Sequence, residues 1–443
     1  MEEDKNGTPE AEPKKPSIIS QLIPYVFAIA ILAYVFTGLS SSVVDEKHTI
    51  TGDEWTALEF DGGRKKTVEV YSEDRVIKYC ASGREYDTVA GCPDGGDYEL
   101  KQDEEGKAPA IKRTGNSRID SGDTVSVDYA KDVRFSEIMA MIGDADLRFF
   151  LPLIILHCLI FFFGDVYSFG QAYRFFNTPD IKTRELMECR GAPYVIQIGL
   201  AVLAEVFFPL YMYRVKKAPV TDIVSSNIWT MILDLSAVFT IITPAVLYNL
   251  YGENLVPAIG PGWLIAVCVF WAVFFANIIF WHSPLQGKAR SWIASGREDT
   301  ESKTRVQKIV GELMQLLRTF SMARWHHYLK VWFVRMIIWI SAIVSNYAAL
   351  LAVGVDPPTA LTLIAIPIIV LAIFQPIGVG GYGGPQLIAW FLLVKLGNAG
   401  TADQVLAYSF LWSTGFLIGR AAIGLFFIRG FWKRTFPSGF SLR

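Results

Sequence analysis

A glycine-rich stretch interrupts an apolar segment that runs from about Thr359 to Leu396. The stretch reads Phe374-Gln-Pro-Ile-Gly-Val-Gly-Gly-Tyr-Gly-Gly-Pro-Gln386 and holds five glycines and two prolines, which a continuous helix tolerates poorly. In hydrocarbon every freed backbone amide and carbonyl needs a partner, so broken helices occur only where protein or a water-filled cavity covers them. Breaks of this kind are where membrane proteins build binding sites.

The chemistry that this stretch offers is recognition of an anionic head group. Glycine amides can face a ligand because no Cβ intervenes. The amides concerned are those of Gly380, Gly381, Gly383 and Gly384. A half-helix that starts near Pro385 would add the positive end of its dipole, and Gln386 could donate through its side-chain amide. The alternative is a closely packed turn with no ligand.

Arg420 lies inside the last apolar segment of the chain. A charge at that depth is costly and by default marks a functional position. Arg420 could bind the phosphate of the same head group; alternatively, it pairs with Asp234 or Glu205 and holds the bundle together.

Three acids, Asp165, Glu205 and Asp234, also fall in apolar segments. They could relay protons or balance nearby arginines, although Asp165 is close to a segment end, which favours simple solvation. A set of basic residues could gather anionic lipid at the inner surface or merely set the topology. These are Arg174, Arg214, Lys216 and Lys217.

No enzyme or metal motif accompanies these residues. The histidines, at 48, 157, 282, 326 and 327, form no His-Glu-x-x-His pattern and no Cys/His metal spacing. The Gly-Gly-Tyr-Gly-Gly run lacks the Lys-Ser/Thr ending of a phosphate-binding Walker loop. We therefore expect no catalytic residue, no metal, no cofactor and no ATP hydrolysis in this chain.

The composition indicates an integral membrane protein. Of 443 residues, 52% are hydrophobic and only 19% are charged, and the mean hydropathy is +0.32. The net charge of −2 gives no electrostatic argument for nucleic-acid binding.

The pattern along the chain divides it into five parts. We expect an all-α polytopic membrane protein with a disordered cytoplasmic N-terminus (1–17), a first transmembrane helix (18–40), an inserted extracytoplasmic β-rich domain (41–145), a larger transmembrane domain (146–430) and a short cytoplasmic tail (431–443). Short alternating pieces in the β-rich part predict strands at 55–60, 67–71, 75–80 and 124–129, and 135–142 predicts a short helix. Cys80 and Cys92 in this part could form a disulfide or remain two free thiols.

Positive charges orient the apolar segments. The basic loop 283–330 and the tail should be cytoplasmic, whereas the loops 251–261 and 354–358 carry no Lys or Arg and should lie outside. The side of every loop agrees with the positive-inside rule if 192–213 and 359–397 are re-entrant hairpins that dip into the membrane from opposite faces. This arrangement leaves about six full transmembrane helices and places both termini in the cytoplasm. A cytoplasmic amphipathic helix is expected at about 303–322, lying on the membrane surface or packed on the protein.

Three pieces of sequence in a fixed order carry a family resemblance. The stretch from Pro376 to Gln386 resembles a signature of the lysylphosphatidylglycerol synthase transmembrane-region family, also called flippase-like, with Gln386 in a place that is usually acidic. Ala204-Glu205 with Arg214 is similar to the family's Gly-Glu-x-x-Arg region, and the Ser226–Leu235 segment with Asp234 is similar to its Glu-Arg-x-x-Asp helix. The resemblance covers about residues 148–430. It implies a lipid-translocating domain in the cytoplasmic (inner) membrane. The chain ends at Arg443 without room for the aminoacyl-transferase domain of some members, so aminoacylation is not implied.

Two functions of different classes remain in view. The chain could translocate an anionic lipid or lipid-linked precursor, such as a phospholipid or a polyprenyl phosphate. Alternatively, it is a membrane-anchored assembly or sensing protein that binds an envelope protein through residues 41–145. A membrane-embedded transferase is less favoured because no donor pocket is evident.

Overall fold

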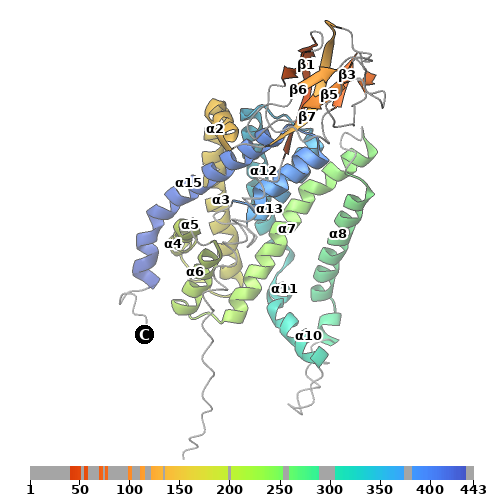
Figure 1. The fold of residues 1–443 in the computed structure, drawn as a ribbon. Helices are drawn as coiled ribbons and strands as arrows, with labels where there is room; N and C mark the ends of the chain where they lie inside the picture. Colours follow the sequence, from red (N-terminus) through yellow and green to blue (C-terminus); the bar gives the residue numbers. More distant parts are fainter. Residues whose placement is uncertain are drawn as a thin grey trace, which may run out of the picture.

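The computed structural model shows a body of long helices with two small β-sheets at one end (Figure 1). It describes residues 40–50, 54–57, 69–72, 75–77, 98–101, 110–114, 121–132, 135–197, 201–252, 259–288, 305–373 and 382–435. We call the end of the helical body next to the sheets the sheet end, and the opposite end, where α10 lies, the α10 end. The expected disordered N-terminus, the first transmembrane helix and the Cys80–Cys92 pair lie outside the described residues.

Within the described ranges, five helices are long and apolar enough to cross a membrane. They are α3 (Leu147–Phe176), α7 (Val220–Tyr251), α8 (Pro261–His282), α12 (Trp325–Ala352) and α15 (Ala402–Thr435). At about 1.5 Å per residue even the shortest, α8 with 22 residues, reaches the ~30 Å of a hydrocarbon core. Each overlaps an apolar segment that the sequence pattern predicts to span, at about 148–170, 226–250, 262–281, 331–353 and 403–428.

The two sheets are antiparallel. One has four strands in the order β1-β7-β3-β4, and the other has three in the order β2-β6-β5. Their bounds are β1 Ser40–Thr49, β2 Thr56–Ala57, β3 Glu69–Ser72, β4 Arg75–Ile77, β5 Tyr98–Lys101, β6 Ala110–Arg113 and β7 Thr124–Asp132. Val125 and Val127 of β7 are buried, the spacing of one face of a strand.

The sequence analysis missed three of these strands. β1 contains Ser, Asp, Glu and Lys, β5 contains Glu and Lys, and β6 is four residues long and ends in Lys112-Arg113, which weakens the alternating pattern that marks a strand. The other four strands, β2, β3, β4 and β7, overlap the four predicted segments, and β2 has two residues. The expected short helix is present as α2 (Phe135–Asp144) and leads from β7 into α3.

Short helices occupy the two segments that were expected to be hairpins. The segment 192–213 contains α5 (Pro193–Gln197) and most of α6 (Ala201–Arg214), which follow α4 (Thr183–Gly191); none of the three is long enough to cross a hydrocarbon core. In the other segment, α13 (Thr359–Ile373) begins at the sheet end of the helical body. α14 (Gly384–Ala389) continues as the π-helical turn η1 (Trp390–Leu396), which ends again at the sheet end. The part of the glycine-rich stretch between them, 374–381, lies outside the described residues.

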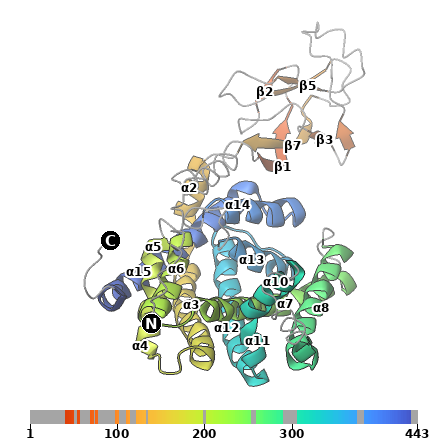
Figure 2. The same ribbon diagram turned by 90° about the horizontal axis from the view of Figure 1, so that it is seen from below.

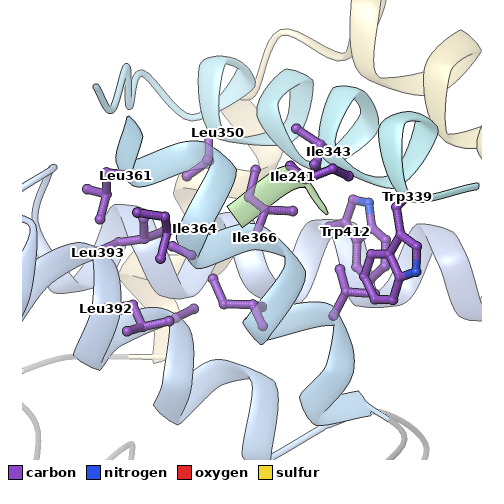
Figure 3. Packing of buried hydrophobic residues seen from close by; sticks show 14 of the residues in the cluster. Ile241, Trp339, Ile343, Leu350, Leu361, Ile364, Ile366, Leu392, Leu393 and Trp412 are labelled. Carbon is purple, nitrogen blue, oxygen red and sulfur yellow. The ribbon is translucent and has the colours of Figure 1, made fainter. Parts of the chain in front are cut away.

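Most of the apolar core lies toward the sheet end. Side chains of α7, α12, α13, η1 and α15 converge there, with Ile364 and Ile366 of α13 almost fully buried (Figure 3). Trp339 of α12 and Trp412 of α15 border this core. Seen along the body, α3, α7 and α12 lie in the middle, with α15 and α4–α6 to one side and α8 to the other (Figure 2).

An ionic clamp joins α4 to the end of α15 and to the loop after α6. The Nζ of Lys216 lies 2.9 Å from Glu185, and the Nε of Arg434 lies 2.5 Å from Glu188. Burial acts to raise the pKa of Glu185, but hydrogen bonds from the Lys182 amide and from Lys216 outweigh it and hold that pKa below its ordinary value. Glu185 is therefore ionised at neutral pH and keeps α4 in place.

The expected amphipathic helix is broken in two. α10 (Arg305–Leu316) and α11 (Arg318–Met322) are separated at Leu317, and Thr319 and Phe320 of α11 are buried. Of the two expected placements, α11 follows the packed one: the Ser225 hydroxyl on α7 accepts a hydrogen bond from the Thr319 amide at 2.9 Å.

Cysteine labelling tests the expected orientation of the body. A Cβ at Gly262, at the sheet end of α8, or at Gly287, just beyond its other end, would meet no atom within 4 Å. We therefore expect Gly262→Cys to react with a membrane-impermeant maleimide in intact cells, and Gly287→Cys to react only after permeabilisation. The parent chain gives the background, since Cys268 is exposed. Equal labelling of both variants in intact cells contradicts the orientation.

Candidate functional site

Asp165 of α3 lies between the buried Arg335 and the mostly enclosed Arg190. Its Oδ2 accepts a hydrogen bond from the Nε of Arg190 on α4 at 2.7 Å, and its Oδ1 accepts one from Arg335 on α12 at 3.1 Å. The Asp165 side chain is 2% exposed, and those of Arg335 and Arg190 are 5% and 13% exposed. The expectation that Asp165 is simply solvated near a helix end is therefore wrong, because α4 folds back over it and supplies a guanidinium group.

Asp234 of α7 completes this centre. Its Oδ1 lies 3.6 Å from Arg335 and accepts a hydrogen bond from the indole Nε1 of Trp339 at 2.9 Å. In contrast to Asp165, its side chain is 28% exposed. We call Asp165, Arg190, Arg335 and Asp234 the charge centre; it contains two carboxylates and two guanidinium groups from four different helices.

Aromatic rings and a glycine shape the charge centre. The guanidinium carbons of Arg190 and Arg335 lie 4.2 and 5.1 Å from the centroid of the Phe169 ring, a distance at which cations are attracted to the ring face. Gly164 lets α3 and α12 approach closely, because a Cβ there would come within 2.7 Å of the Ile338 side chain. This approach brings Arg335 within reach of Asp165.

Arg420 lies in a separate aromatic environment. Its guanidinium carbon is 4.2 Å from the centroid of the Tyr194 ring and about 5 Å from those of Phe161 and Phe416. Asp234, one of its two expected partners, is paired with Arg335 instead. The side chain of Glu205, the other expected partner, lies outside the described part of the structure, although its backbone belongs to α6.

The described part of the glycine-rich stretch is a tight, buried turn. Gly383 has φ +101°, a value that favours glycine, and its amide donates to the Oε1 of Gln386 at 2.7 Å. The Gln386 amide also points to the Ser413 hydroxyl at 3.4 Å, and the side chain is fully buried. Gln386 thus satisfies its own turn, and α14 starts at Gly384, next to the expected Pro385. Gly380 and Gly381 lie outside the described residues.

The expected site residues therefore fall into separate places. Arg420 is on α15, and Gln386 contacts the same helix through Ser413. Ser413 and Arg420 are seven residues apart, about 10 Å along the helix. Among the basic residues, Arg174 donates to the Thr183 hydroxyl and Lys216 is held by Glu185. Arg214 and Lys217 are exposed at the α10 end.

Sequence reasoning missed the roles of Arg190 and Arg335. Arg335 is a single charge within the apolar segment 331–353, so the rule that singled out Arg420 applies to it equally. Arg190 carried no such signal, because it lies outside the apolar segments, in the basic stretch 171–190 that the positive-inside rule places on the cytoplasmic side.

Long apolar helices around paired charges define an integral membrane protein of mainly helical fold. The chain belongs to the family described as the lysylphosphatidylglycerol synthase TM region, whose model matches residues 200–432. No curated protein and no solved structure matches the chain. The match begins later than the resemblance seen in the sequence, so Asp234, Arg335 and Arg420 fall within it and Asp165 and Arg190 do not.

Removing the acid shared by both arginines should destabilise the protein. Asp165→Asn leaves Arg190 without its carboxylate and Arg335 with only the longer contact to Asp234, and breaking a buried pair typically costs about 3–5 kcal/mol. We expect a clearly lower melting temperature in detergent. The matched change is Asp146→Asn at the N-cap of the same helix, in an exposed ion pair with Arg148; Asn also caps a helix well, so the melting temperature should be nearly unchanged. Equal effects of the two changes contradict the assigned role of Asp165.

The turn at Gly383 should resist substitution. Gly383→Ala forces an L-residue to adopt φ +101° and should destabilise the protein by about 1–3 kcal/mol. Gly262→Ala, at a position with open space and no positive φ, should not. Thermal unfolding of both variants measures this, and an unchanged Gly383→Ala protein argues against the turn as described.

Proposed function

We propose that this protein translocates a lipid with an anionic head group across the cytoplasmic membrane. Membership of the lysylphosphatidylglycerol synthase TM region family supports a lipid-related role. The chemistry of the charge centre supports the choice of an anionic head group, since arginine is the side chain best suited to bind phosphate.

The observation that carries the proposal is the depth and exposure of Asp234. It lies 14 residues after the start of α7 at Val220 and 17 before its end at Tyr251, about 21 and 26 Å along the helix. A partly exposed carboxylate at that depth is costly if it faces lipid tails. We propose that water or a polar head group reaches Asp234 from its exposed side, as passage of a head group requires.

Buried polar pairs extend from the charge centre toward the sheet end. Along α12, Ser341 bonds to His157 at 2.9 Å, and Ser345 accepts from Trp412 at 3.0 Å. One residue further, Asn346 accepts from the Tyr408 hydroxyl at 2.7 Å. We propose that these pairs, with Arg420 beside them, form the polar side of the path, and that the lipid tails remain in the bilayer.

Two short hairpins fit this function. If the α10 end is cytoplasmic, α5–α6 dips in from the cytoplasm and α13–α14 dips in from outside, each without crossing. Re-entrant elements from opposite faces suit a binding site between them. Arg214 and Lys217, exposed at the α10 end, would then attract anionic lipid from the inner leaflet.

Reconstitution into liposomes tests the function. We expect the wild-type protein to move tail-labelled phosphatidylglycerol between leaflets faster than protein-free liposomes, and faster than it moves zwitterionic phosphatidylcholine. Arg335→Gln should reduce the rate at least tenfold because it removes a phosphate-binding group, whereas Arg148→Gln at the exposed pair should not.

A second variant distinguishes loss of the phosphate-binding group from misfolding of the protein. Arg335→Gln with Asp234→Asn removes one positive and one negative charge, leaves the Asp165–Arg190 pair intact, and should fold but stay inactive. Wild-type protein that is no faster than empty liposomes, or a fully active double variant, would overturn the proposal.

A further inference from the structure

The two carboxylates of the charge centre are held very differently. Asp165 receives hydrogen bonds from both guanidinium groups and is 2% exposed. Asp234 has one arginine at the longer distance of 3.6 Å and one indole N–H, and is 28% exposed. Of the two acids, Asp234 is therefore the one that a proton or a competing anion can reach and detach from Arg335.

We propose that Asp234 takes up a proton when Arg335 binds the phosphodiester of a lipid head group. This inference rests on the proposed function and adds the coupling of head-group binding to protons. The proton binds to a carboxylate oxygen of Asp234 and removes its negative charge. Arg335 keeps its bond to Asp165 and turns its other amino group to a phosphate oxygen. No covalent bond to the lipid forms or breaks.

The charges of the centre account for the coupling. With both acids ionised, two carboxylates balance two guanidinium groups and the centre is neutral. Protonation of Asp234 leaves one net positive charge at membrane depth, which is costly in isolation. One phosphodiester carries one negative charge and restores neutrality. Each event therefore stabilises the other, and by linkage the effect is reciprocal.

The groups around Asp234 allow this assignment. Arg335 and Trp339 face it from α12, and Asp165 is the nearest acid on α3. α13 carries no titratable side chain. On α8, His282 bonds to Ala323 at the α10 end, away from this centre. On α11, Arg318 pairs with Asp222 at the start of α7.

His157 does not provide the same proton site. The hydroxyl of Ser341 donates to the Ile338 carbonyl at 2.7 Å, so it must accept from the Nδ1 of His157 at 2.9 Å. His157 thus donates to Ser341 through Nδ1 and is enclosed, only 1% exposed, by an aromatic group with Trp412 and Phe416.

The experiment measures lipid binding against pH. Purified full-length protein in a neutral detergent is titrated with short-chain phosphatidylglycerol between pH 5 and 8. If one proton enters with each lipid, the dissociation constant rises about tenfold per pH unit on the alkaline side of the transition. Asp234→Asn, which mimics the protonated acid, should bind at every pH about as tightly as the wild type does at low pH.

The matched control is Asp222→Asn on the same helix, which should keep the pH dependence of the wild type. Wild-type binding that does not change with pH, or an Asp234→Asn protein that keeps the wild-type dependence, overturns the inference. If liposomes that contain the wild-type protein still translocate lipid in that case, the proposed function is retained and only the proton coupling is rejected. An absence of both binding and translocation overturns both.

Discussion

One carboxylate shared by two arginines inside an apolar bundle is the interaction on which the rest of the structure depends. Asp165 on α3 binds Arg335 on α12 and Arg190 on α4, and so holds α12 and α4 against α3. A buried charge without its partner is strongly destabilising, so these helices cannot separate independently. The ionic clamp of Glu185 and Glu188 with Lys216 and Arg434 then fixes α4 from the other side and ties it to the end of α15.

The bundle consequently has two parts of different character. Toward the sheet end the core is mainly apolar and contains a few paired polar groups, such as Gln386 with the amide of Gly383. Toward the α10 end the core contains the charge centre, and Asp234 is partly exposed there. The turn at Gly383 thus starts α14 in a buried place, while the two guanidinium groups of the charge centre lie on α12 and α4.

Several features could be predicted from single segments. The apolar lengths predicted α3, α7, α8, α12 and α15, and the glycines and prolines predicted the break between α13 and α14, because these signals are local. The pairing of Asp165 with Arg335 joins residues 170 positions apart, and no periodicity or composition reports such a contact. Three polar strands were missed for a related reason, since their stability comes from neighbouring strands rather than from their own alternation.

By itself, the sequence determined that the chain is an integral membrane protein, where its long helices lie, and which segment is interrupted. These properties follow from transfer of apolar side chains out of water and from the backbone limits of glycine and proline. Only the tertiary structure decided which charges meet, which of two similar aspartates is enclosed, and that Gln386 is used within its own turn. Burial and partner geometry arise from packing between distant segments, so no single segment of the sequence reports them.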